Sequence, residues 1–154
     1  MEFTKGFIEN LFAEAAGNPR LRTNVDLRNS GSDSSQRMLN ALLPGTKVDI
    51  HRHPMSSESV VCLCGRLDEV LYDACGNETD RITLCPSEGR YGCQIPAGAW
   101  HTVEVFEPSV ILEAKDGKYG EDGSERWAQK LAQKFIFLNG CDTDACDFCS
   151  YQPK

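Results

Sequence analysis

The feature that most constrains the fold is the sequence pattern of residues 36–114, where short apolar segments alternate with Gly, Pro, Asn and Asp. Segments of this kind are typical of strands, and a spacing of about ten residues is typical of an antiparallel sandwich or barrel. The sequence therefore predicts a mainly β fold. The expected strands are 37–43, 47–53, 58–64, 67–73, 80–84, 92–95, 101–106 and 109–114.

Two helical patterns flank this region. In residues 4–16 the apolar side chains recur on one helical face, with Thr4 placed to cap the start and Gly17 to end the helix. Residues 124–138 repeat the pattern, with Ser124 as the expected cap. We accordingly expect one domain in three parts: an N-terminal helix and lead-in loop over 1–35, a β-barrel over 36–120, and a C-terminal helix with a Cys-rich tail over 121–154.

Charge and hydropathy exclude two classes of partner. The net charge of −7 argues against nucleic acid and against anionic membranes, which both require clustered Lys and Arg. No apolar run approaches ~20 residues, and charges interrupt the first residues, so we expect neither a membrane span nor an export signal. These features predict a cytoplasmic protein, in which the 8 cysteines are mostly reduced thiols.

The chain has 3 histidines, and all of them fall in strand candidates. His51 and His53 leave the same face of one expected strand, with Cα atoms about 6.5–7 Å apart. Glu58 begins the next strand, and His101 follows a tight Pro-Ala-Gly turn. Three imidazoles and a carboxylate suit one divalent transition metal ion such as Zn, Fe, Mn or Ni. Spacing alone leaves open that each is an ordinary core or surface residue.

Two motifs carry a resemblance to a known superfamily. Gly45-x5-His51-x-His53-x4-Glu58-x6-Gly65 resembles the first cupin motif, and Gly92-x3-Pro96-x-Gly98-x2-His101 resembles the second. The second motif departs from the usual pattern in its shorter Gly-to-Pro spacing and in Val105, where Asn is common. The resemblance implies a single cupin (jelly-roll) β-barrel with flanking N- and C-terminal helices, whose metal ligands are His51, His53, Glu58 and His101.

A narrower resemblance covers more of the chain. "NPRLRTN" (18–24), "QRMLNALLPGT" (36–46), "HRHP" (51–54), "IPAGAWHTV" (95–103) and "LEAKDGKYG" (112–120) are similar to the WbuC family of cupin-fold metalloproteins. These are small bacterial proteins often associated with surface-polysaccharide gene clusters. The resemblance implies a small polar ligand, such as a sugar or sugar-nucleotide.

The reaction stays open at this point. A metal-dependent isomerase, epimerase or dioxygenase fits the ligand set, and so does a non-catalytic binding or sensing module with a structural metal. Candidate substrate-binding residues lie in or beside the WbuC-like segments, although each could equally form a surface ion pair or pack in the core. They are Arg22, Arg37, Trp100, Lys115 and Tyr119.

The tail and the oligomeric state complete the expectations. Cys141, Cys146 and Cys149 are spaced like part of an iron–sulfur loop, but a fourth cysteine is missing nearby. Our hypothesis is that this tail carries no required metal.

Cupin barrels frequently pair through edge strands, which are otherwise exposed to aggregation, so we expect a homodimer.

Overall fold

A computed structural model describes residues 1–118 and 120–127 of the chain, and its strands form two five-stranded antiparallel sheets. The elements are α1 (Lys5–Gly17), β1 (Arg22–Asp26), β2 (Ser35–Leu42), β3 (His51–Arg52), β4 (Glu58–Cys64), β5 (Leu67–Tyr72), β6 (Glu78–Leu84), η1 (Pro86–Glu88), β7 (Gly92–Ile95), β8 (Trp100–Val105), β9 (Ser109–Asp116) and β10 (Glu125–Arg126).

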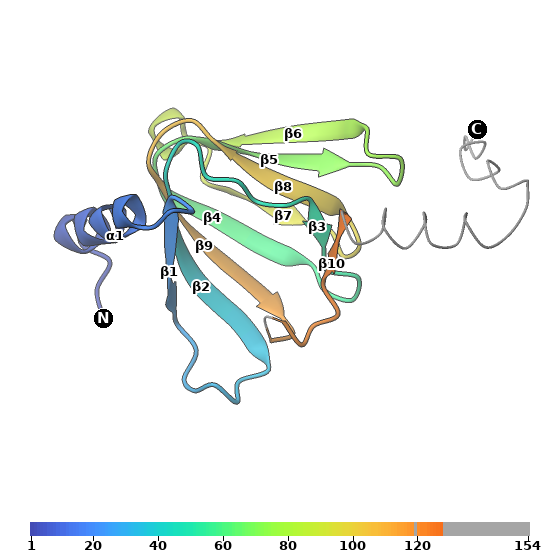
Figure 1. The fold of residues 1–154 in the computed structure, drawn as a ribbon, viewed down its shortest axis with the longest axis horizontal. Coiled ribbons are helices and arrows are strands. Elements are labelled where there is room, and N and C mark those ends of the chain that lie inside the picture. Colours follow the sequence, from blue (N-terminus) through green and yellow to red (C-terminus); the bar gives the residue numbers. More distant parts are fainter. Residues whose placement is uncertain (119, 128–154) are drawn as a thin grey trace, which may run out of the picture.

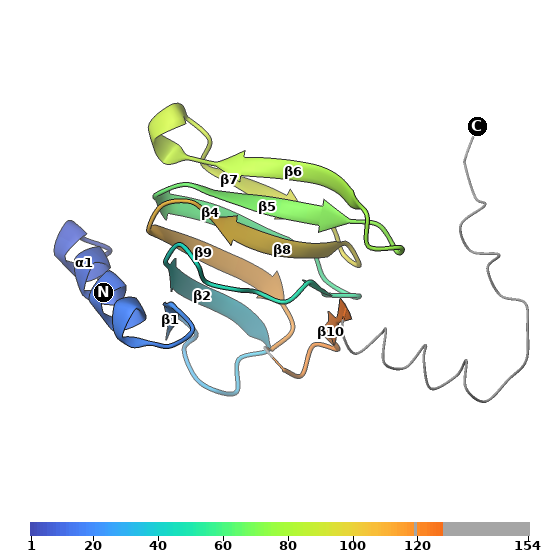
Figure 2. The same ribbon diagram turned by 45° about the horizontal axis from the view of Figure 1, so that its top comes forward.

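The two sheets face each other, with the order β1-β2-β9-β4-β7 in one and β10-β3-β8-β5-β6 in the other (Figures 1 and 2). Neighbouring strands in a sheet are mostly distant in sequence, because the chain passes repeatedly from one sheet to the other. This arrangement is a jelly roll, which agrees with the antiparallel sandwich or barrel that the strand pattern predicted and with the fold that the cupin resemblance implied.

Apolar side chains form two separate cores. The larger core lies between the sheets and includes Leu42, Val60, Leu67, Leu84 and Ile111. The second lies under α1, which packs on β1 and β2, and includes Leu11, Ala15, Leu39, Ala41 and Val110. Alternate residues of β2 and β9 therefore contribute to different cores, as the two faces of a strand require.

The N-terminal helix agrees with its prediction. The Phe7 N–H donates to the Thr4 hydroxyl over 3.3 Å, which confirms Thr4 as the cap. The helix extends to Gly17. Most expected strands are also confirmed to within two residues at their ends.

Three expectations about secondary structure were wrong. Residues 22–26, assigned to a lead-in loop, form the edge strand β1, whose sequence RTNVD offers only one apolar side chain to a pattern. The strand expected over 47–53 is reduced to His51–Arg52, since the backbone before it bonds differently. The Val48 carbonyl accepts from the Thr102 hydroxyl, and the Ile50 carbonyl accepts from the Trp127 N–H.

The third error concerns the residue at which the expected C-terminal helix begins. Glu125–Arg126 form β10, which pairs with β3, so no helix begins at Ser124. The remainder of that expected helix lies outside the described residues, as do Tyr119 and the tail cysteines Cys141, Cys146 and Cys149. Within residues 1–118 and 120–127, no helix combines the length and apolar character needed to cross a bilayer.

Candidate metal centre

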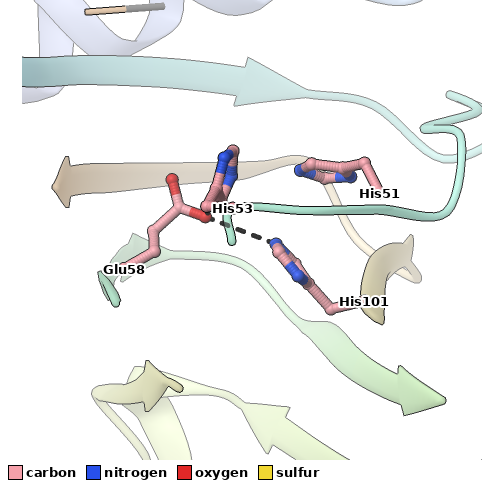
Figure 3. Close-up of side chains that lie close together, drawn as sticks. All are labelled: His51, His53, Glu58 and His101. Carbon is pink, nitrogen blue, oxygen red and sulfur yellow. Dashed lines mark ion pairs between the residues drawn. The ribbon is translucent and has the colours of Figure 1, made fainter. Parts of the chain in front are cut away.

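Four side chains meet between the two sheets. One ligand atom from each of His51, His53, Glu58 and His101 lies within 4.8 Å of the others, and Figure 3 shows the four groups gathered around one region. His53, Glu58 and His101 are 6%, 4% and 3% exposed, whereas His51 is half-buried. The group is therefore nearly enclosed, with its most accessible side at His51.

Backbone pairing explains why residues far apart in the sequence meet here. His51 on β3 is the register partner of His101 on β8. The Gly98 N–H donates to the His53 carbonyl over 2.8 Å, and Gly98 has a φ of +78°, which favours glycine in this turn. Glu58 begins β4 in the facing sheet. His51 and His101 thus come from one sheet, His53 from the residue directly after β3, and Glu58 from the facing sheet.

Hydrogen bonds fix the tautomers of two imidazoles. His51 Nδ1 lies 2.9 Å from the Asp49 carbonyl oxygen, and His101 Nδ1 lies 3.0 Å from that of Ala99. A carbonyl oxygen only accepts, so each ring carries a hydrogen on Nδ1, and the neutral form of each ring has its electron pair on Nε2. Burial, reinforced by the neighbouring His101, lowers the pKa of His51 to about 4, so this ring is neutral at pH 7.

His53 is held from outside the barrel strands. Its Nδ1 lies 2.8 Å from Ser124 Oγ and 3.1 Å from Asp122 Oδ2. The Ser124 hydroxyl and the Lys115 ammonium both donate to the same Asp122 oxygen. Burial would raise the pKa of Asp122, but the bonds from Lys115 and Ser124 hold it well below its ordinary value. Because the Ser124 hydroxyl gives its hydrogen to Asp122, the Ser124 oxygen and the Asp122 carboxylate are both acceptors for a hydrogen on His53 Nδ1, and Nε2 of the neutral ring is left for a ligand.

The inward atoms form a donor set that needs a positive charge. Nε2 of His53 and Nε2 of His101 each lie 3.4 Å from Oε2 of Glu58, while Oε1 of Glu58 is buried without a hydrogen-bond partner among the described residues. Electron pairs that face one another in a buried site repel unless a cation lies between them. Neutral imidazole nitrogens and a carboxylate are ligands that divalent transition metals accept, so the residues present fit such an ion.

The other predicted site residues lie in different surroundings. The Lys115 ammonium is linked to His53 through Asp122, which contacts both. Arg37 pairs with Asp33 over 2.7 Å. The Trp100 ring is buried against the Arg52 guanidinium, 4.6 Å from the ring centre, and the Trp127 ring. Arg22 lies on edge strand β1, three strands away from Glu58 in the same sheet. Their role in ligand binding stays a prediction.

Sequence reasoning missed two residues that hold His53. Asp122 and Ser124 belong to the polar stretch GEDGSE, which carries no periodicity, and Ser124 was interpreted as a helix cap. Their contact with His53 spans about 70 positions, so no local pattern could have indicated it.

Comparisons with solved structures identify the fold. Oxalate decarboxylase from Bacillus subtilis is 20% identical with a TM-score of 0.57, and the match covers 79% of this chain and 33% of that one. The capsular polysaccharide assembling protein CapF from Staphylococcus aureus is 16% identical with a TM-score of 0.59, covering 71% and 32%. A candidate sugar phosphate isomerase from Acidithiobacillus ferrooxidans is 18% identical with a TM-score of 0.53, covering 70% and 66%.

The first two of these proteins are about three times as long as the matched part, so the chain spans about a third of their length. At these identities the likeness establishes the fold alone, and that fold is the cupin jelly roll. The molecule is thus a cupin-fold protein with a His3Glu cluster inside its barrel.

The family is established by sequence. Residues 3–84, more than half of the chain, match the family described as Domain of unknown function (DUF6016), and the chain belongs to it. The matched segment contains His51, His53 and Glu58 and ends before His101. A search of curated proteins found no match.

Proposed function

We propose that the protein is a metal-binding cupin in which His51, His53, Glu58 and His101 hold one divalent transition metal ion. The observation that carries this proposal is the convergence of their inward atoms within 4.8 Å, while the Nδ1 atoms of the three rings are bonded elsewhere. Zinc, iron, manganese and nickel all suit this donor set.

The protein binds or acts on a small polar molecule beside the ion. A bound ion of this type can polarise a carbonyl or activate water. Four protein ligands leave a position for the molecule in five- or six-coordinate geometry, and the half-buried side of His51 gives it access. The chain itself fixes the donor atoms before the ion binds. Isomerase, epimerase and dioxygenase reactions are all compatible with this arrangement.

The small molecule is a sugar or sugar-nucleotide used in surface-polysaccharide metabolism. The resemblance to the WbuC family supports this, and so do the names of two proteins of similar fold, which refer to capsular polysaccharide assembly and to a sugar phosphate isomerase.

A second candidate function is a non-catalytic binding or sensing module with a structural metal. The near-complete burial of His53, Glu58 and His101 favours it, because structural sites are closed to solvent. Exchange of a metal-bound water distinguishes the two. Rapid exchange, measured by water-proton relaxation of the manganese-loaded protein, supports a catalytic or ligand-binding ion.

Elemental analysis tests the proposal directly. Protein purified without a histidine tag and without added metal is expected to carry about one ion per chain. His101→Ala and Glu58→Gln should each lower that content severalfold, whereas Glu88→Gln, on exposed η1, should leave it unchanged. Metal-free wild-type protein that also fails to bind added metal would refute the proposal, as would full metal content in both ligand variants.

A further inference from the structure

A short segment after β9 holds one side of the metal centre. Beyond β9 the chain passes to the opposite sheet, where β10 pairs with β3 (Figures 1 and 2). We call residues 120–127 the strap. Asp122 and Ser124 of the strap contact Nδ1 of His53. Nε2 of the same ring lies 3.4 Å from Oε2 of Glu58, so the strap lies on the side of His53 that faces away from Glu58.

Short strands and exposed ion pairs fasten the strap to the barrel. Strand β10 is two residues long, lies at the edge of its sheet and pairs with β3, which is equally short. The Trp127 N–H donates to the Ile50 carbonyl over 2.8 Å. Two ion pairs, whose four side chains are each at least 30% exposed, join the strap to the chain around β3, and they are Arg52–Glu125 and Arg126–Asp49. Ion pairs this exposed contribute little stability.

Two further contacts add to this fastening. The Trp127 ring meets the Trp100 ring edge-on, with centroids 4.9 Å apart. Asp122 is paired with Lys115, and their side chains are 1% and 0% exposed. The attraction within such a pair is largely offset by the hydration that both charges lose, and undocking of the strap restores that hydration. No residue of the strap belongs to either apolar core of the described chain, and segments with little buried apolar surface open more readily than cores do. The strap can therefore undock while the barrel stays folded.

Undocking changes one proposed ligand and leaves the other imidazoles in place. His53 loses its contacts with Asp122 and Ser124, so its ring is free to rotate and to take either tautomer. Only one tautomer of a neutral ring has its electron pair on Nε2. The Nδ1 atoms of His51 and His101 face carbonyl oxygens that lie outside the strap, so these rings keep their orientation. The docked strap thus completes a site that is only partly arranged without it.

We infer that the strap controls the entry and release of the metal ion: it undocks to expose His53, and the bound ion in turn holds it docked. The inference rests on the proposed function and adds a moving part to that site. With the strap docked, His53, Glu58 and His101 are at most 6% exposed, so an ion exchanges more easily once the strap has undocked. An ion that binds the docked state more tightly must shift the equilibrium toward that state.

Hydrogen exchange followed by mass spectrometry tests this coupling in the unaltered chain. The peptide that contains residues 120–127 is compared in the zinc-loaded and the metal-free protein at one pH and temperature. We expect its amides to exchange at least about fivefold more slowly when zinc is bound. Peptides of α1, which packs on β1 and β2, are the internal control. Slowing of the strap that does not exceed the slowing of α1 would overturn the inference.

The rate at which zinc passes from the protein to an excess of a chromophoric chelator tests the control of release. Trp127→Ala removes a ring contact but neither a ligand nor a partner of a ligand, so we expect about tenfold faster release. Glu125→Gln breaks the ion pair with Arg52 and should act in the same direction with a smaller effect. The matched control is Phe106→Ala, because the Phe106 ring packs on Arg66 beyond the other end of β8.

The outcomes separate this inference from the proposed function. Wild-type or slower release in both strap variants would overturn the inference, because the ion would then leave by another route. Equally fast release from Phe106→Ala would overturn it as well, since the barrel as a whole would then have loosened. Glu125→Gln alters one exposed pair, so it remains a folded test protein if Trp127→Ala does not fold. Failure of the wild-type protein to hold zinc or any other divalent ion would instead contradict the proposed function, on which the inference rests.

Discussion

The most informative perturbation of the metal centre is Asp122→Asn, which alters no ligand. A single oxygen of Asp122 accepts from the Lys115 ammonium and the Ser124 hydroxyl and lies 3.1 Å from Nδ1 of His53. The Lys115 and Asp122 side chains are 0% and 1% exposed. The substitution preserves the shape of the side chain but removes the charge that holds these groups together.

The substitution should have two consequences, one for the unfolding free energy and one for the metal affinity. Lys115 becomes a buried ammonium without a counter-charge, which costs about 3–5 kcal/mol of unfolding free energy. His53 loses the carboxylate that keeps its hydrogen on Nδ1 and its electron pair on Nε2, and losing such a partner typically lowers metal affinity about 10–100-fold. The combined variant Lys115→Met with Asp122→Asn separates the effects. It removes both charges, so stability should largely return while metal affinity stays low.

Chemical denaturation measures the first effect, and competition with a chromophoric chelator for Zn²⁺ or Co²⁺ measures the second. Asp116→Asn is the matched control, since Asp116 is exposed at the end of β9. Wild-type metal affinity in the stable double variant would refute the reasoning, because His53 would then be oriented without Asp122. A visible Co²⁺ spectrum identical to that of the wild type would lead to the same conclusion.

Other predictions address stability, the tail and assembly. Burial raises the folded-state pKa of Glu113 to about 8, so the folded protein loses stability as pH rises from the ordinary pKa of a glutamate toward 8. Glu113→Gln should therefore gain stability relative to the wild type over that range, by at most about 1.4 kcal/mol per pH unit. Parallel curves of unfolding free energy against pH for the two proteins would contradict this. Gly65→Ala should lower the unfolding free energy measured by denaturation by more than about 1 kcal/mol. Gly65 has a φ of +87°, and an added Cβ would clash with the Pro108 carbonyl oxygen. A neutral effect would show that this turn rearranges. Truncation after Gly140 should leave bound metal per chain unchanged, and a halving would reject our hypothesis about the tail cysteines. Sedimentation at low concentration should detect a homodimer, and a monomer there would make that expectation wrong.

Local pattern was sufficient for much of the fold. Turn-forming residues separate the strands of 58–64, 67–73 and 92–95 from their neighbours clearly enough for each strand to be located to within a residue. The N-terminal helix could be predicted equally well, because its cap and its apolar face are both local features of the sequence. The edge strands β1 and β10 were missed because they are short or largely polar, and their pairing with β2 and β3 defines them.

The sequence by itself determined the chemistry available to the centre: three imidazoles and one carboxylate on strand-like segments beside tight turns, a set that suits a transition metal. Only the tertiary structure decided which ring nitrogen faces inward and that Asp122 and Ser124 hold His53. The physical reason is the separation along the chain of the residues that determine each feature. Residue types and alternation are encoded locally, whereas a tautomer and a buried charge depend on groups that the packing of the whole barrel brings together from distant parts of the chain.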